Sequence, residues 1–99
     1  MLNLFNRQKG KVKYVVKGKP GSFDVTYTCG DETHQVPEVK SGWVHTFPCP
    51  QNDYYFVAAQ ANKKDAAVKI KVYRDGKLLK EANNYGDYAI VVASSTKNP

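Results

Sequence analysis

Two cysteines and two histidines are the residues of this sequence best suited to metal or redox chemistry. They are spaced as C-x4-H-x10-H-x3-C, from Cys29 through His34 and His45 to Cys49. Zinc takes thiolate and imidazole ligands in tetrahedral sites, but structural zinc sites usually contain tight ligand pairs such as C-x-x-C. No such pair is present in the sequence. We therefore expect no metal and no other cofactor.

A disulfide between Cys29 and Cys49 is a second interpretation of the cysteines. Cys29 ends one predicted strand and Cys49 follows another, and in a three-strand meander these two strand ends meet at one end of the domain. A bridge would close a loop of about 20 residues, worth roughly 3 kcal/mol in the chain-entropy model. It would also imply an oxidising compartment. Two free, largely buried thiols remain the alternative.

The other polar residues do not indicate an enzyme. The serines lie in predicted turns or in the tail, with no G-x-S-x-G motif around them. Asp24 and the Asp31-Glu32 pair fall on a predicted outward face and in a loop, where carboxylates are ordinarily found. His45 alternates in step with Trp43 and Phe47, which favours a hydrogen-bonded histidine at the edge of the core over a catalytic base.

The chain is basic, and nearly all of its positive charge comes from lysine. It has 15 Lys+Arg against nine Asp+Glu, a net charge of +6, and its only arginines are Arg7 and Arg74. Base and phosphate recognition favours arginine, whose planar fork binds two acceptors at once. We therefore expect a solvated basic surface and no nucleic-acid partner.

Aromatic residues make up 12% of the chain, which is enough for a binding surface in addition to a core. Tyrosine and tryptophan are enriched at interfaces, although ordinary packing on the faces of a sheet is the simpler explanation. The outward positions of the predicted strands and one loop define a candidate binding surface, which consists of Tyr55, Tyr73, Tyr85, Lys69 and Lys71.

These residues must be positioned by β-strands, because apolar and polar residues alternate along most of the chain. Strands are predicted over 11–17, 23–29, 33–36, 43–47, 54–60, 88–93 and both arms of a hairpin over 68–82. Strand 54–60 is apolar on both sides, which suggests a central, doubly covered strand. Residues 83–86 are predicted to form a turn, and Pro37 is predicted to end its strand.

The spacing of these strands predicts a single all-β domain, an antiparallel, immunoglobulin-like β-sandwich of seven to eight strands. The domain is expected over 11–94, with a flexible leader or linker over 1–10 and a flexible tail over 95–99. We expect it to be a monomer.

The turn of the hairpin over 68–82 has two possible registers. Asp75-Gly76 alone favours a two-residue loop, but a simple two-residue register would place Lys71 opposite Lys80 and turn Glu81 inward. A three-residue loop over 74–76 pairs Tyr73 with Lys77 and places Lys69 opposite Glu81. Because an inward, unpaired carboxylate is costly, the three-residue loop is predicted.

Six segments, in this order and spacing, resemble the soluble domain of the MmpS family, small membrane proteins first described in mycobacteria. They are V-K-Y-V-V-K-G (12–18), F-D-V-T-Y (23–27), W-V-H-T-F (43–47), Y-Y-F-V-A-A-Q (54–60), V-K-I-K-V-Y-R-D-G-K (68–77) and Y-G-D-Y-A-I-V-V (85–92). The resemblance implies a β-sandwich on the extracytoplasmic side. It also implies an N-terminal membrane tether, no enzymatic activity, and a role in assisting lipid or siderophore exporters of the RND type.

Two features differ from the family. This sequence contains no membrane segment, so we expect the anchor to lie outside it. The paired cysteines of the family lie in the late strands, where this sequence has lysine, isoleucine and alanine.

The resulting expectation is a non-enzymatic domain, periplasmic or on the outer surface, that acts through protein or envelope contacts. The alternative is a soluble module that binds a lipid or a glycan through an aromatic patch. A partner-binding domain should show an exposed face and no deep polar pocket, whereas a ligand module should contain a concave apolar site of about 300–1,000 Å³.

Titration of thiols in the native, unreduced protein separates the two states of Cys29 and Cys49. A bridge predicts no titratable thiol before reduction and two after it. Two titratable thiols in the native protein would contradict the bridge.

Overall fold

The computed structural model describes residues 11–29, 32–48 and 55–95, and the side chains of all of these except 29, 47 and 48. The described residues form eight strands: β1 (Lys11–Lys19), β2 (Ser22–Cys29), β3 (Glu32–Lys40), β4 (Trp43–Pro48), β5 (Phe56–Ala61), β6 (Ala66–Arg74), β7 (Lys77–Gly86) and β8 (Ile90–Ser94). The proposed Cys29–Cys49 bridge, the leader 1–10 and most of the tail lie outside this part of the chain. No helix within it is long and apolar enough to cross a membrane.

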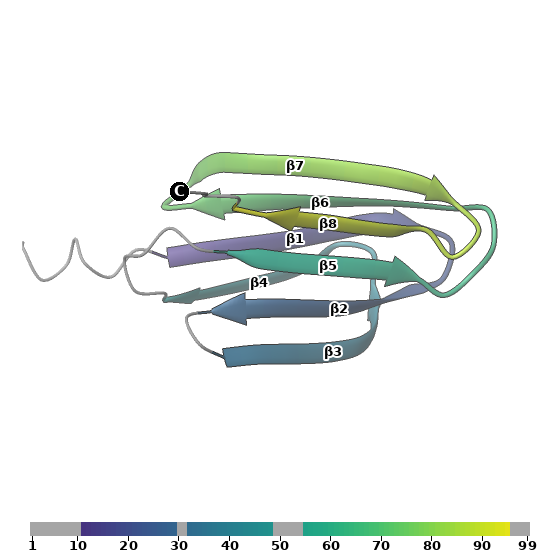
Figure 1. Cartoon of the computed structure of the whole chain (residues 1–99), viewed down its shortest axis with the longest axis horizontal. Coiled ribbons are helices and arrows are strands. Elements are labelled where there is room, and N and C mark those ends of the chain that lie inside the picture. The colour runs from purple at the N-terminus through teal and green to yellow at the C-terminus, as the bar shows by residue number, and fades with distance from the viewer. Residues whose placement is uncertain (1–10, 30–31, 49–54, 96–99) are drawn as a thin grey trace, which may run out of the picture.

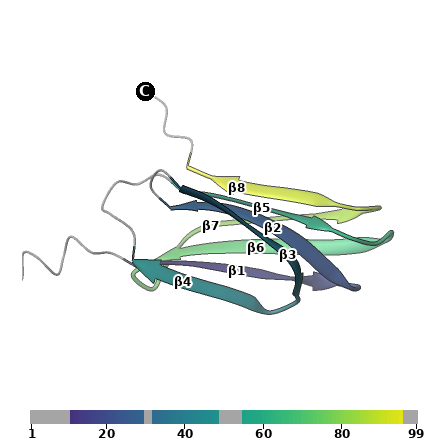
Figure 2. The ribbon, with the colours of Figure 1, turned by 90° about the horizontal axis from the view of Figure 1, so that it is seen from below.

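The strands form two four-stranded antiparallel sheets that stack face to face. One sheet has the order β4-β1-β6-β7 and the other the order β3-β2-β5-β8. Figures 1 and 2 show these two layers from perpendicular directions. The predicted antiparallel β-sandwich is therefore confirmed.

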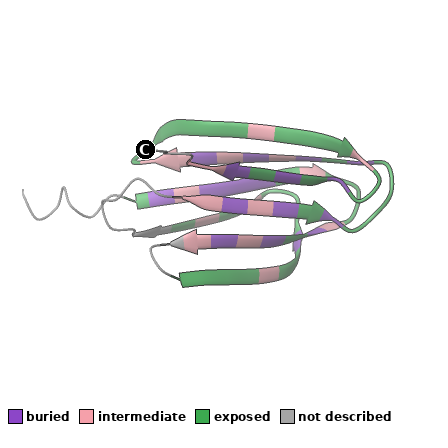
Figure 3. Cartoon of the chain, in the orientation of Figure 1, coloured by how far each residue is buried: buried purple, intermediate pink, exposed green. Residues whose placement is uncertain are grey.

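The core lies between the inner faces of the two sheets. β1 and β6 contribute alternate side chains, and β2 and β5 contribute the opposing layer; the largest of these that are fully buried are Tyr14, Phe23, Ile70, Val16, Val25, Val57, Val68 and Val72. Because successive side chains of a strand point to opposite faces, the residues between them are directed away from the core. Figure 3 shows the edge strands β3 and β7 as mostly exposed.

The β6–β7 hairpin has a two-residue turn, so the predicted three-residue loop is wrong. Arg74 pairs with Lys77, and Asp75 (φ 50°) and Gly76 (φ 83°) both have positive φ, as a type I′ hairpin turn requires. The register shifts by one residue at Val72 and Tyr73. Because of this bulge, Lys71 does not lie opposite Lys80, and Glu81 does not point inward.

The bulge places Lys71, rather than Lys69, opposite Glu81 in the β6–β7 ladder. The Nζ atom of Lys69 nevertheless lies 3.3 Å from Oε2 of Glu81, across the diagonal of the sheet. The predicted ion pair on the solvent face is thus present, although in a different register from the predicted one.

Strand β3 continues past Pro37, where it was predicted to end. It is an edge strand, and its pairing with β2 shifts between Phe23 and Val25. Proline is tolerated at edges and bulges because its missing N–H is not needed there. Glu38, which has φ 55°, donates its backbone N–H to Oδ1 of Asp24 at 3.0 Å.

Two further sequence predictions require correction. Residues 83–86 are not a turn, since they extend β7 and pair with β6 as far as Gly86 with Ala66. Strand β5 is central but covered on one face only, because a two-layer sandwich leaves an outer face on each sheet. Val57, Ala59 and Ala61 are buried, whereas Phe56 and Ala58 are only partly covered.

Replacement of Gly18 by alanine should lower the free energy of unfolding by about 3 kcal/mol, the upper part of the usual overpacking range. A Cβ atom at Gly18 would overlap the carbonyl oxygen of Ala67 and lie 2.9 Å from Cζ of Phe23. Urea denaturation measures the loss.

Gly42→Ala is the matched control, because a Cβ atom at Gly42 would meet no atom within 4 Å, although the φ angle there is +94°. Backbone strain alone should then cost about 1–2 kcal/mol. A smaller loss for Gly18→Ala than for Gly42→Ala would contradict the packing described here.

Candidate binding surface

The outer face of the β4-β1-β6-β7 sheet gathers lysines from two neighbouring central strands. Val12, Tyr14 and Val16 of β1 point into the core, and so do Val68, Ile70 and Val72 of β6. The residues that alternate with them along β1 and β6 therefore point outward, and five of these are lysines. We name this surface the lysine face and define it by Lys13, Lys17, Lys19, Lys69 and Lys71.

The charges on the lysine face are poorly compensated. Lys17 and Lys69 are direct cross-strand partners, an arrangement of like charges that destabilises a sheet. Glu81, 3.3 Å from Lys69, is the single acidic side chain at the described strand positions of this face. The sheet therefore presents a net positive surface to solvent, which favours an acidic partner.

Tyrosines flank the lysine face at both ends. Tyr73 lies opposite Lys13, whose Nζ is 4.7 Å from the centre of the tyrosine ring, within the range of a cation–π contact. Tyr85 lies on β7 opposite Ala67 and is 79% exposed. Tyr85 was predicted to lie in a loop, but the structure holds it in a strand on the same face as Tyr73, Lys69 and Lys71.

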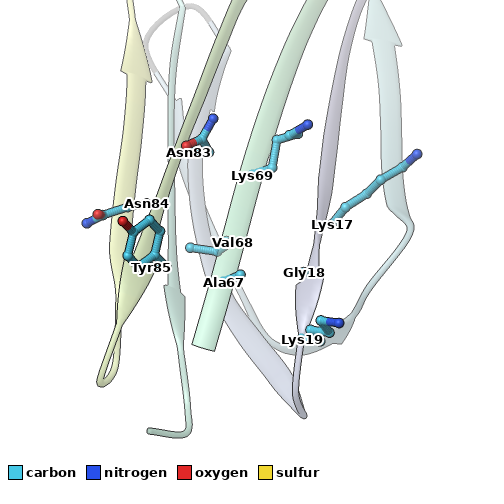
Figure 4. Close-up of a pocket in the computed structure, with 9 residues that line it drawn as sticks. All are labelled: Lys17, Gly18, Lys19, Ala67, Val68, Lys69, Asn83, Asn84 and Tyr85. Carbon is cyan, nitrogen blue, oxygen red and sulfur yellow. The ribbon is translucent and has the colours of Figure 1, made fainter. Parts of the chain in front are cut away.

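A groove of about 400 Å³ lies at the Tyr85 end of the lysine face. Figure 4 shows that β1, β6 and β7 supply its lining, which consists of Lys17, Gly18, Lys19, Ala67, Val68, Lys69, Asn83, Asn84 and Tyr85. An adjoining hollow of about 260 Å³ shares Lys19, Ala67 and Tyr85 with it. The sequence did not reveal this groove, because strands far apart in the chain line it.

Tyr55 does not belong to this surface. It directly precedes β5 in the other sheet and is partly buried against the core. Its backbone N–H donates to Oγ of Ser95 at 3.2 Å. Burial raises the pKa of the Tyr55 hydroxyl above its ordinary value of 10.0. Of the five predicted surface residues, the structure brings together the other four.

The outer face of the second sheet has a different character. Ile90 and Val92 of β8 are about half exposed, at 51% and 48%. Ala58, the cross-strand partner of Val92, and the nearby Phe56 are partly covered. Lysine is absent from the described outward positions of β2, β5 and β8. The outer face of the first sheet is therefore cationic, whereas that of the second carries no lysine at these positions.

A cluster of aromatic and histidine side chains joins the β4 edge of one sheet to β2 and β3 of the other. The hydroxyl of Tyr27 lies 3.0 Å from Nε2 of His45. The Tyr27 ring is 5.2 Å from the ring of His34, and the rings of Trp43 and His45 stack at 5.8 Å between centres. His45 is thus a half-buried, hydrogen-bonded histidine, as the sequence predicted.

This cluster contains the two histidines of the C-x4-H-x10-H-x3-C pattern. Across residues 11–29, 32–48 and 55–95, no three His, Cys, Asp or Glu side chains gather closely enough to hold a metal ion. The Cys29 side chain and Cys49 lie outside the described residues. In the described residues these side chains pack together, and Tyr27 and His45 form a hydrogen bond between the two sheets.

Comparison with known proteins gives no relative from which a function can be transferred. No protein-family model matches the chain, and no curated protein matches it. A functional assignment therefore depends on the residues and their geometry.

Tyr27→Phe should lower the free energy of unfolding by about 1 kcal/mol, because it removes the hydroxyl that bonds His45 inside the structure. Tyr85→Phe is the matched control, since that side chain is largely exposed and should change stability by less than about 0.5 kcal/mol. Urea denaturation of both variants measures the difference. Equal effects would contradict a structural role for the Tyr27–His45 contact.

Proposed function

We propose that this chain is a non-enzymatic binding domain of the cell envelope that works through its lysine face. Its resemblance to the MmpS family suggests an extracytoplasmic location, a membrane tether and a membrane exporter of the RND type as the protein partner. The observation that carries the proposal is the concentration of lysines on one outer face of the sandwich.

The placement of the lysines supports a binding role. Lys17 and Lys69 face each other across neighbouring strands, so mutual repulsion lowers the stability of the folded protein. An acidic partner would relieve this repulsion and would gain association rate from the positive field. A face that serves only for solubility has no need for this alignment, since lysines dispersed over the whole surface would serve equally well.

The flanking tyrosines add contact area to the charged face. Tyr73 is partly buried under Lys13, so its ring is held in place, whereas Tyr85 is free to contact a partner. Tyrosine supplies a large, rigid contact surface at low entropic cost. Charge would then guide the encounter, and the two tyrosine rings would contribute short-range contacts.

A soluble module that binds a lipid or a glycan is the second candidate function. The groove beside Tyr85 favours it, since a volume of about 400 Å³ lies within the range of small-ligand sites. Its position at one end of the lysine face makes the two functions compatible.

Site-specific photo-crosslinking in cells that produce the tethered protein tests the use of the lysine face. A benzoylphenylalanine at Tyr73 should give an adduct with an envelope protein. The same residue at Tyr88, which is 48% exposed and lies between β7 and β8, should not. Adding Lys13→Glu and Lys71→Glu should lower the yield from position 73 at least about tenfold, if each change removes roughly 1 kcal/mol of charge pairing.

The proposal fails if position 88 gives the same adduct as position 73, or if position 73 gives none. It also fails if the charge-reversed protein, shown to be folded by its denaturation curve, gives an unchanged yield.

A further inference from the structure

We propose that the groove beside Tyr85 binds a sugar ring that carries an anionic substituent, such as a carboxylate, a phosphate or a sulfate. This inference rests on the proposed use of the lysine face and names a ligand class for one end of it. Three properties of the groove carry the inference: the short side chain of Ala67, the exposed ring of Tyr85, and two lysines, Lys17 and Lys19, that form no ion pair within the described residues.

A short side chain keeps the groove open. Ala67 lines it from β6, at an outward position opposite Lys19. Gly18 allows β1 and β6 to pack closely beneath it, because a Cβ atom there would point at the buried Phe23 ring and overlap the Ala67 carbonyl oxygen. The longer side chains of Lys17, Lys69 and Tyr85 surround this low area (Figure 4). The hollow is thus set by the short Ala67 side chain among longer neighbours.

Tyr85 provides an exposed ring at the edge of the groove. Its 79% exposure is the greatest among the large hydrophobic side chains of the described residues. It is attached to a regular strand, opposite Ala67, and not to a loop. The negative face of an aromatic ring attracts partially positive C–H groups, and the C–H face of a sugar ring presents such groups.

The polar residues of the groove match the hydroxyl and anionic groups of an acidic sugar. Asn83 lies opposite Lys69, and an asparagine amide both donates and accepts hydrogen bonds, as a hydroxyl does. Asn84, opposite the buried Val68, donates instead from Nδ2 to the carbonyl oxygen of Ile90 in β8 at 3.0 Å. Lys17 and Lys19 form no ion pair within the described residues.

An acidic sugar fits this arrangement better than a lipid or a nucleic acid. The described lining contains no large aliphatic side chain other than Val68, so it offers little for an acyl chain. Its cations are all lysines, which attract an anion as a point charge but lack the planar fork that reads base edges. A sugar ring with a negative charge uses Tyr85 and the lysines together.

Isothermal titration calorimetry with a heparin-derived tetrasaccharide tests the inference, with neutral maltotetraose as the uncharged probe. The heparin probe should bind, and maltotetraose should not. Tyr85→Ala should weaken binding about tenfold, which corresponds to a stacking contact of about 1.4 kcal/mol. Lys17→Ala should weaken it about threefold, as loss of one exposed ion pair predicts. The controls Tyr73→Ala and Lys13→Ala, at the other end of the face, should stay within about twofold.

Three results would overturn the groove proposal. The first is no binding of the heparin probe. The second is equal weakening by the groove variants and by the controls at the other end, which would indicate general attraction to the lysine face and leave the proposed function standing. The third is binding to phosphatidylglycerol vesicles or to inorganic sulfate that is as tight as binding to the tetrasaccharide, since neither contains a sugar ring. Loss of the crosslink from Tyr73 with normal heparin binding would instead contradict the protein partnership alone.

Discussion

The structure depends on the burial of alternate side chains of β1 and β6 against β2 and β5. Tyr14, Val16, Ile70 and Val72 are all fully enclosed, and each large apolar side chain buried in this way contributes about 1.5–3 kcal/mol relative to exposure. Since a strand has only two faces, this burial fixes the direction of every intervening residue. The lysines of β1 and β6 therefore lie on the outside, and the pairing of these two strands brings them together.

This constraint connects the fold to its proposed use. Apolar burial is strong enough to hold Lys17 opposite Lys69, because cross-strand repulsion is worth only about 0.2–1 kcal/mol. The second sheet is built by the same alternation, yet it places Ile90 and Val92 outside where the first sheet places lysines. The cationic face is thus a property of the particular residues of β1 and β6, and not of β-sandwich architecture in general.

Local patterns in the sequence predicted most of the fold. Alternation identified the strands and the inward residues of β1, β2 and β6, and the Asp75-Gly76 dipeptide located the hairpin. The register could not be obtained in this way, because the bulge at Val72 and Tyr73 depends on pairing along the whole of β6 and β7. Pro37 was wrongly predicted to end its strand for a related reason. A strand tolerates proline when it lies at a sheet edge, and the sequence alone does not show that β3 does.

The candidate surface was only partly accessible to prediction. Alternation along β6 alone predicts the outward direction of Lys69, Lys71 and Tyr73. Lys17 and Lys19 join them through the pairing of β1 with β6, which connects distant parts of the chain and leaves no local signal. Tyr55 was assigned outward by parity alone, but its contacts with the core place it elsewhere.

Lysine acetylation footprinting tests the central claim most directly. The protein is treated with an acetylating reagent in the presence and absence of the cell-envelope fraction of the producing cells, and mass spectrometry gives the rate at each lysine. We predict slower acetylation of Lys13, Lys17 and Lys71 with the envelope present, and unchanged rates at Lys63 and Lys64 in the exposed β5–β6 loop. Equal protection at all of these sites, or protection confined to the loop, would contradict the lysine face as the binding surface.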